Sequence, residues 1–183
     1  MSPIRLVLVA LAIIVVLGCQ QPTPSNGPSA TADPTPTTAP TGSQAIQFTK
    51  GDEKALAALI AAHKGQVVFV DYWATWCHPC VEYFPHTVEM SRKYKDRGLA
   101  TIAVSFDDPA DESPPRAFLA KQRAEFENLQ SSYDPGPAAF EGFGIDLVPH
   151  FRLYDRTGKL RHKWDAKPED ADEKIEELLA EKP

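Results

Sequence analysis

Cysteine is scarce in this sequence of 183 residues, which has three, at positions 19, 77 and 80. A domain stabilised mainly by disulfides needs more than three cysteines. We therefore expect a fold stabilised by a hydrophobic core, which a hydrophobic content of 43% can supply. Lys and Arg number 19 against 25 Asp and Glu, and they form no basic stripe. Nothing in the composition therefore indicates a nucleic-acid partner.

The N-terminal apolar run Leu6–Leu17 has twelve residues, which is short for a bilayer span of roughly 20 residues. Arg5 precedes the run, as in a signal peptide. The run ends in Val16-Leu17-Gly18-Cys19, which resembles the lipobox of bacterial lipoproteins, although that family usually has Leu at the position of Val16. The resemblance implies that residues 1–18 are removed and that Cys19 is acylated. Secretion with cleavage elsewhere, or an uncleaved anchor, is the alternative.

Aromatic and aliphatic residues are almost missing between Gln20 and Gln44, where six prolines alternate with Thr, Ser, Ala and Gly. Such a segment buries too little apolar surface to offset the entropy lost on ordering. As a flexible coil its 25 residues reach ~25–30 Å. We therefore expect residues 19–44 to tether a folded domain that comprises residues 45–183.

The region from residue 45 onward alternates between helical and strand patterns. We expect helices over residues 52–63, 79–97 and 116–126, and a final helix with Ile175, Leu178 and Leu179 inward. Apolar runs predict buried strands over residues 67–72 and 99–106, an acidic loop covers 107–115, and residues 151–154 and 159–164 predict a hairpin. This order predicts an α/β domain with helices on a mixed sheet.

Cys77 and Cys80 stand where a predicted strand turns into a helix, and at this spacing they can close a small disulfide ring. Cys77 faces the unpaired N–H groups and the positive end of the helix dipole. Both favour the thiolate, which is the nucleophile of disulfide exchange. Cys80, one turn into the helix, suits the resolving role. Pro79 between them costs little, because a first-turn N–H would have no helical partner.

Other chemistries for this cysteine pair fit less well. A zinc site needs a second Cys or His pair at similar spacing, and Cys19 is the one further cysteine. Covalent haem attachment needs His directly after the second Cys, where Val81 stands. A purely structural disulfide would close too short a loop to constrain the chain much. The pair therefore favours redox chemistry.

The stretch Val67–Pro85 (VVFVDYWATWCHPCVEYFP) resembles the active-site region of thioredoxin-like proteins, especially the TlpA/ResA-like branch. That branch has Trp-Cys-x-Pro-Cys and a Pro five residues after the second Cys, as here. Val148-Pro149 and the turn 155–159 resemble its cis-proline loop and hairpin. The resemblance covers roughly residues 45–183. It implies a thioredoxin fold, with a mixed central sheet flanked by helices, and a redox-active disulfide between Cys77 and Cys80.

The resemblance also assigns roles to individual residues. It makes Cys77 the attacking thiol, Cys80 the resolving thiol and Pro149 a cis-proline beside the disulfide. Further residues would line the site: Trp73, Trp76, His78, Pro79 and Val148. The two tryptophans are equally consistent with ordinary core aromatics. Neither a cofactor nor a metal ion is implied.

Four residues depart from the branch. Asp71 stands where Asn is common, although thioredoxins have Asp, and Tyr83 stands where Glu is common. His78 is unusual between the cysteines; it either lowers the pKa of the Cys77 thiol when protonated or is merely exposed. His150 follows Pro149 where Thr is usual, and we favour a polar residue at a strand end over a metal ligand.

Asp71 is a candidate general acid–base, because it lies in an apolar strand that we expect to be covered on both faces. Burial of a lone carboxylate should raise its pKa toward that of a thiol, as general acid–base catalysis near neutral pH requires. Glu82 lies about 100° around the helix from Tyr83, so it is a poor substitute for the missing acid. We expect Asp71 to exchange a proton with Cys80. The alternative is an Asp that caps backbone groups at a strand end.

Several functions remain open at this point. The resemblance implies an enzyme on a bacterial membrane that reduces disulfides of extracytoplasmic proteins, often in cytochrome c maturation, and is recharged by a membrane thiol donor. An oxidase or isomerase is the nearest alternative. A copper-handling protein that uses the cysteines with His78 or His150 is less consistent, because such relatives usually space their cysteines three apart. The intact cysteine pair argues against a redox-inactive scaffold.

Lipidation predicts that the mature protein begins at Cys19 and partitions with membranes. Cys19→Ser should release the protein into the soluble fraction, and intact mass should show the loss of the lipid. Unchanged membrane association of this variant would contradict the lipoprotein assignment.

Overall fold

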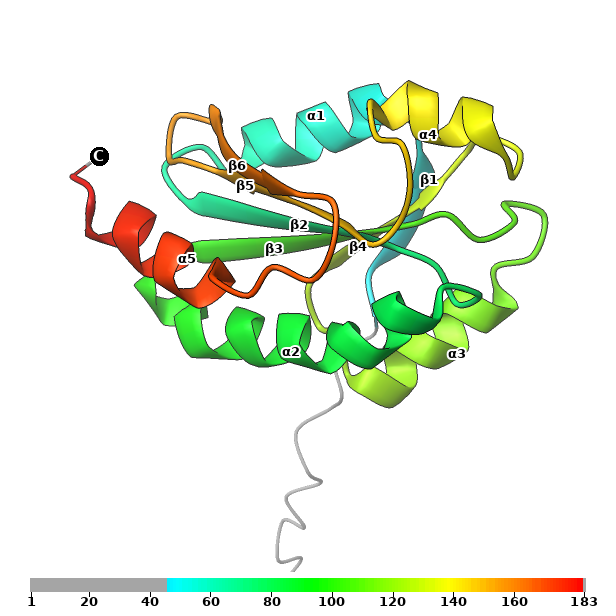
Figure 1. Cartoon of the computed structure of the whole chain (residues 1–183), viewed down its shortest axis with the longest axis horizontal. Helices are drawn as coiled ribbons and strands as arrows, with labels where there is room; N and C mark the ends of the chain where they lie inside the picture. Colours follow the sequence, from blue (N-terminus) through cyan, green and yellow to red (C-terminus); the bar gives the residue numbers. More distant parts are fainter. Residues whose placement is uncertain (1–45, 183) are drawn as a thin grey trace, which may run out of the picture. The chain divides into compact units, whose positions relative to one another are not determined.

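The computed structural model describes residues 46–182, which form one six-stranded sheet with the order β1-β4-β3-β2-β5-β6 (Figure 1). The strands are β1 (Phe48–Gly51), β2 (Val67–Trp73), β3 (Leu99–Ser105), β4 (Glu127–Ser131), β5 (His150–Tyr154) and β6 (Leu160–Trp164). The helices are α1 (Glu53–Ala62), α2 (His78–Tyr94), α3 (Ser113–Gln122), α4 (Pro137–Phe143) and α5 (Ala171–Ala180), with a 3-10 turn at Lys95–Arg97. The predicted signal peptide, the lipidation site and the tether lie outside the described residues.

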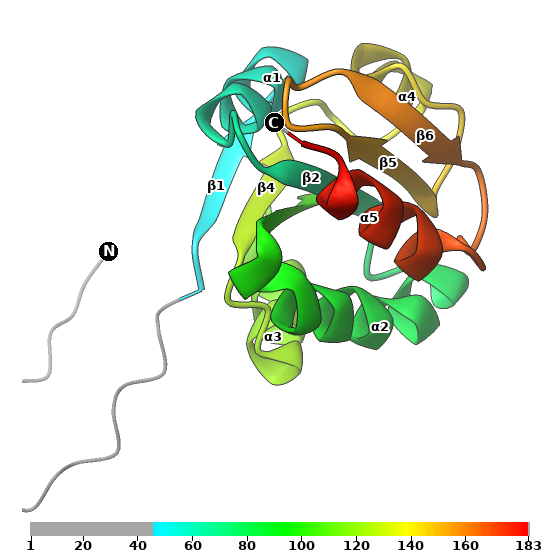
Figure 2. The same cartoon turned by 90° about the vertical axis from the view of Figure 1, so that its left-hand side faces the viewer.

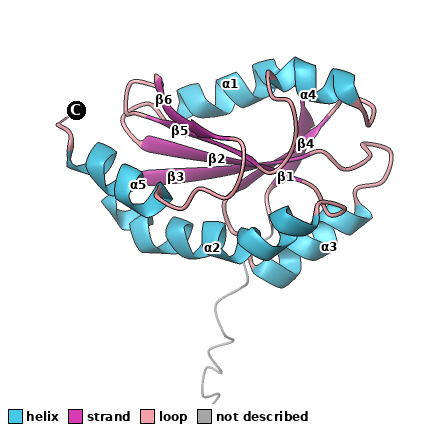
Figure 3. Ribbon diagram, in the orientation of Figure 1, coloured by secondary structure: helices cyan, strands magenta, loops and turns pink. Residues whose placement is uncertain are grey.

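The sheet is mixed and carries helices on both faces. Strands β1 to β4 are parallel, whereas β5 pairs antiparallel with β2 and β6 pairs antiparallel with β5. Helices α1 and α4 cover one face, and α2, α3 and α5 cover the other (Figures 2 and 3). Between residues 46 and 182, no helix combines the length and the apolar character that crossing a bilayer requires.

The sequence did not predict β1, β4 or α4, and β4 shows why. Its residues Glu-Asn-Leu-Gln-Ser are mostly polar, yet all but Glu127 are buried. The Asn128 side-chain amide donates to three backbone carbonyl oxygens, and that of Gln130 donates to the carbonyl of Asp108 at 2.9 Å. These partners satisfy the amide donors, whereas Asn128 Oδ1 and Gln130 Oε1 are buried without a hydrogen-bond partner among the described residues. Hydrophobic patterning cannot reveal such contacts.

The expected boundaries of α3 were wrong. The helix begins at Ser113 and not at residue 116, because Pro114 and Pro115 occupy its first turn, where a missing N–H is tolerated. It ends at Gln122, before residue 126, since Arg123 adopts a left-handed conformation with φ of 54°.

Strand β2 is buried along its whole length, as its apolar run predicts. Val68, Val70 and Tyr72 belong to the cluster that includes Leu56 and Ile60 of α1. The alternate side chains Val67 and Phe69 pack with residues of α2, β5 and α5. Asp71 follows the second set by the two-residue period of a strand, so it faces α2.

The ends of β2 and β5 place the candidate residues at one end of the sheet. The loop to α2, which carries Cys77, begins directly after β2 ends at Trp73. Strand β5 runs antiparallel to β2, and its first residue His150 pairs with Tyr72. The loop that contains Val148 and Pro149 therefore lies at the same end of the sheet as the cysteines.

The packing of α5 against this sheet predicts a stability effect. Ile175 is completely buried, so Ile175→Ala should lower the free energy of unfolding by about 2–5 kcal/mol. Glu177 lies on the exposed side of the same helix and pairs with Lys174, so Glu177→Ala should change stability by less than about 0.5 kcal/mol. Urea unfolding of both variants measures the difference, and equal effects would contradict the packing of α5.

Candidate active site

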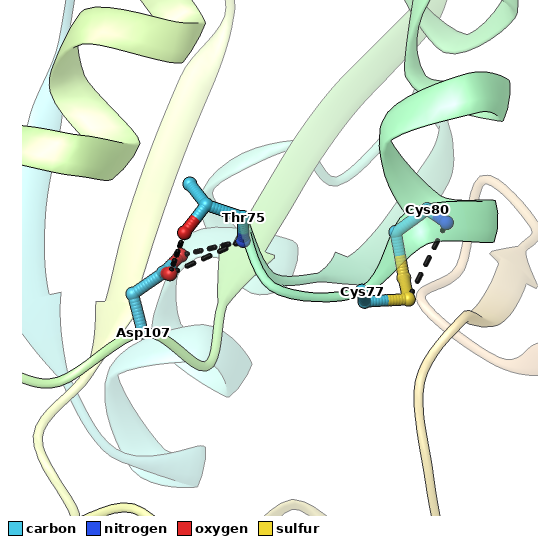
Figure 4. The surroundings of a disulfide bond; sticks show 4 residues. All are labelled: Thr75, Cys77, Cys80 and Asp107. Atoms are coloured by element: carbon cyan, nitrogen blue, oxygen red, sulfur yellow. Dashed lines mark hydrogen bonds between the residues drawn. A yellow bond between two sulfur atoms is a disulfide. The ribbon is translucent and has the colours of Figure 1, made fainter.

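Cys77 and Cys80 form a disulfide at the N-terminus of α2 (Figure 4). Cys77 is the N-cap residue of the helix, and its Sγ accepts the backbone N–H of Cys80 at 3.3 Å. The cap position has an extended backbone, which lets a side chain turn back onto the first-turn N–H groups. Once the disulfide opens, the same N–H and the helix dipole stabilise negative charge on Cys77.

The two cysteine residues differ in exposure. The exposed fraction is 6% for Cys77 and 2% for Cys80, which makes Cys77 the more accessible of two largely covered residues. His78 points into solvent, and its Nε2 lies 3.2 Å from Oε1 of Glu82 one turn along the helix. This geometry corresponds to the exposed alternative for His78.

Asp107 holds the loop before Cys77, and the sequence did not single it out. Its buried carboxylate accepts the backbone N–H of Thr75 at 3.1 Å and the Thr75 hydroxyl (Figure 4). It also accepts the Ser105 hydroxyl at 2.7 Å. Thr75 is two residues from Cys77, so the carboxylate ties the cysteine loop to the end of β3. A Thr and an Asp 32 residues apart carry no motif that would reveal this contact.

Asp71 is a buried carboxyl with a single side-chain partner. It is 2% exposed, and its Oδ2 accepts the hydroxyl of Thr87 at 2.7 Å. Burial raises the pKa of Asp71 from 3.8 to about 7, against a lowering by the Thr87 hydrogen bond. Among residues 46–182, Asp71 makes no side-chain hydrogen bond to backbone, so the strand-end cap is not the arrangement found. Thr87 and Cys80 are seven residues apart, two turns on one face of α2, and Asp71 therefore lies on the side that carries Cys80.

Tyr83 occupies the helix position where the branch commonly has Glu. Its ring packs edge-on against Phe151 at 5.1 Å, and its hydroxyl is buried without a hydrogen-bond partner among the described residues. Burial, and then the negative charge of Asp71, raises the pKa of Tyr83 above its ordinary value. Tyr83 is thus an apolar wall that supplies no acid of its own.

The Val148–Pro149 peptide bond is cis, and the residue after it is anchored. His150 is 3% exposed; its Nδ1 lies 2.8 Å from Oδ1 of Asp165, and its Nε2 accepts the Nε–H of Arg152 at 3.1 Å. Burial, followed by the charge of Arg152, lowers the pKa of His150. Both ring nitrogens have partners, which fits a polar residue that fixes the start of β5 and not a free ligand.

The two tryptophans have different environments. Trp73 is completely buried between Phe84 and Phe118, with ring centroids 4.7 and 4.8 Å away. Its interpretation as a core aromatic therefore holds. Trp76, directly before Cys77, is 61% exposed and lies at the surface beside the disulfide.

A Cys-x-x-Cys disulfide at a helix N-terminus, next to a strand that follows a cis-proline, is the arrangement of oxidoreductases of the thioredoxin type. The sequence profile of the Redoxin family matches residues 35–179. The chain therefore belongs to the Redoxin family, and the predicted thioredoxin fold and oxidoreductase class are confirmed.

Individual relatives agree with this class. Thiol-disulfide oxidoreductase ResA of Bacillus thuringiensis subsp. konkukian is 28% identical over 138 residues, which cover 75% of this chain and 76% of ResA. Protein DipZ of Mycobacterium bovis is 37% identical over 103 residues, which cover 54% of this chain but 14% of DipZ. A candidate thiol:disulfide interchange protein DsbE from Chlorobium tepidum superposes with a TM-score of 0.56 and 31% identity, over 66% of this chain and 85% of its own.

The raised pKa of Asp71 predicts that its burial lowers the free energy of unfolding by an amount that depends on pH. The folded protein keeps the proton up to a pH of about 7, whereas the unfolded chain loses it near 3.8, so stability falls as pH rises between these values. Asp71→Asn should therefore match wild type near pH 4 and exceed it by about 4 kcal/mol at pH 8.

Urea unfolding of the oxidised protein across this pH range measures the effect without titration of the thiols. Asp134→Asn, which removes an exposed carboxylate, is the matched control. A gain in Asp71→Asn that does not vary with pH would contradict a buried, titrating carboxyl.

Proposed function

We propose that this protein is a lipid-anchored extracytoplasmic oxidoreductase that reduces protein disulfides through Cys77 and Cys80. The observation that carries the proposal is the position of Cys77 as the N-cap of α2, with Sγ accepting the Cys80 N–H. A thiolate there is stabilised before any substrate arrives, and Cys77 is the more exposed of the two cysteine residues.

In the first step the Cys77 thiolate of the reduced protein attacks one sulfur of a substrate disulfide. A bond forms between Cys77 Sγ and that sulfur, and the substrate disulfide breaks. The second substrate sulfur leaves as a thiolate and takes up a proton. The rate of this step depends on the accessibility and the thiolate character of the attacking sulfur.

In the second step Cys80 resolves the mixed disulfide. Asp71 accepts the proton of the Cys80 thiol, and the resulting thiolate attacks Cys77 Sγ. The Cys77–Cys80 disulfide forms, and the substrate leaves with both sulfurs reduced. A carboxyl with a pKa of about 7 suits this transfer, because it both accepts and returns a proton near neutral pH.

The direction of the reaction is reductive in this proposal. A charged His78 against Cys77 would stabilise the thiolate and make the pair more oxidising, but His78 points to solvent and pairs with Glu82. The negative charge of buried Asp71, by contrast, opposes a second anion at Cys80. Both arrangements favour a reducing pair.

The remaining roles follow from the resemblance to the TlpA/ResA-like branch. The loop of Val148 and Pro149 lies at the disulfide end of the sheet, where we propose that it contacts the substrate backbone. Acylated Cys19 would hold the domain at a bacterial membrane, close to a membrane thiol donor that restores the dithiol. The branch often serves cytochrome c maturation, which makes an apocytochrome disulfide a suitable first substrate to test.

The cysteine roles predict different outcomes for two variants. Cys77→Ser should abolish disulfide reduction, whereas Cys80→Ser should accumulate a mixed disulfide through Cys77, because no resolving thiol remains. Asp71→Asn should remain folded but exchange several-fold more slowly, at the step that uses Cys80. Non-reducing electrophoresis and stopped-flow kinetics measure these effects.

Equilibration with glutathione tests the direction. At an oxidising poise of about −180 to −210 mV, a reductant should be mostly in the disulfide form. A pair that stays mostly reduced there would make the protein an oxidant. Trapping through Cys80 in the Cys77→Ser variant would reverse the two roles, and Glu82→Gln serves as the carboxylate control for Asp71→Asn.

A further inference from the structure

A small apolar hollow is lined in part by Trp76, the residue before Cys77, and the proposed chemistry does not use it. Its volume is about 300 Å³, and six residues line it: Trp76, Phe106, Pro135, Gly136, Ala139 and Phe140. None of these residues carries a charge. The hollow has room for one bulky apolar side chain.

The walls of this hollow are built into the fold. Phe106 is 3% exposed, and its ring packs against Phe140 and Phe143 of α4 with centroids 5.0 and 5.3 Å away. A second lining residue, Trp76, follows Thr75, which the Asp107 carboxylate holds. The hollow is therefore formed before a substrate binds, which reduces the ordering cost of binding.

The proposed attack of Cys77 on a substrate disulfide indicates which part of the substrate lies over this hollow. A substrate sulfur must reach bonding distance of Cys77 Sγ, and Trp76 is the adjacent residue. An extended polypeptide advances about 3.3–3.6 Å per residue, so side chains within two residues of the substrate cysteine fall over the surroundings of Trp76. The occupant is therefore the segment that flanks the attacked cysteine, in an oxidised polypeptide.

The chain segments that supply most of the walls of the hollow are acidic. Residues 105–111 and 132–149 contribute every lining residue except Trp76, and neither segment contains Lys, Arg or His. They contain exposed carboxylates at five positions: Asp108, Asp111, Asp134, Glu141 and Asp146. Segments of this composition attract a positively charged polypeptide and repel an acidic one.

We propose that this hollow is a substrate subsite, which selects disulfides in basic polypeptide segments with an aromatic or large aliphatic side chain within two residues of the attacked cysteine. The subsite rests on the proposed reduction of protein disulfides and adds its substrate class. Burial of the apolar side chain supplies affinity in the mixed disulfide, and the acidic segments 105–111 and 132–149 favour Lys or Arg beside it.

Matched peptide disulfides test the subsite with the reduced full-length protein. Two lysine-containing peptides differ only in Trp or Ser two residues before the cysteine, and a third replaces the lysines of the Trp peptide with Glu. The Trp peptide should be reduced about tenfold faster than the Ser peptide, the gain expected for burial of one large apolar side chain. The Glu peptide should be slower, with a difference that shrinks as salt is added.

Two variants each change one lining residue of the hollow. Trp76→Ala removes an exposed side chain, so folding is preserved, and Phe140→Ser removes the wall contributed by α4. Both should bring the rates for the Trp and Ser peptides together. Leu160→Ala is the matched control, because Leu160 is also an exposed apolar residue, 41% exposed, but pairs with Tyr154 at the other end of β5. Leu160→Ala should still reduce the Trp peptide faster than the Ser peptide.

Hydroxyethyl disulfide has no side chain to place in the hollow. Its reduction therefore tests the proposed disulfide reductase activity separately from the proposed subsite. If wild type reduces it but treats the Trp and Ser peptides alike, the subsite is overturned and the proposed function stands. If wild type reduces none of these disulfides, both fail. A preference that survives in Trp76→Ala and Phe140→Ser also overturns the subsite, and equal rates for the Lys and Glu peptides overturn its charge selectivity.

Discussion

Strand β2 lies in the middle of the sheet, between β3 and β5, with helices packed on both of its faces. Its seven residues are all buried, so its hydrogen-bonding groups and side chains have fixed neighbours. The cysteine loop begins at its last residue, and its antiparallel pairing with β5 brings the cis-proline loop alongside. A shift of β2 by one residue would exchange its two faces and move Asp71 away from α2. The register of this one strand thus sets the geometry of the whole site.

The site combines two electrostatic environments a short distance apart. At the N-terminus of α2, a backbone N–H and the helix dipole favour negative charge on Cys77. Behind the helix, the apolar surroundings of Asp71 disfavour charge and give the carboxyl a pKa of about 7. One group thus lies where negative charge is stabilised and the other where it is not, which suits the nucleophile and the proton carrier that we propose. With Tyr83 an apolar contact, the strand supplies the buried acid of this region.

Much of this arrangement could be predicted from the sequence, because the signals were local. The apolar run of β2 and the Cys-x-x-Cys spacing each concern a few adjacent residues, and burial of Asp71 follows from its place in that run. Long-range contacts could not be predicted. The Asp107–Thr75 anchor and the buried amides of β4 join residues that are distant in the chain and polar in type. A hydrophobicity pattern assigns such residues to the surface.

The outer strands of the sheet also affect how the molecule meets other extended chains. Exposed backbone at a sheet edge is a template for pairing with a further strand. Strand β1 has four residues, and the opposite edge, β6, carries Arg161, His162 and Lys163 in its middle. A short edge and a positively charged edge both discourage a further strand from joining. Both edges of the sheet therefore disfavour intermolecular strand pairing, which protects the folded domain against edge-to-edge aggregation.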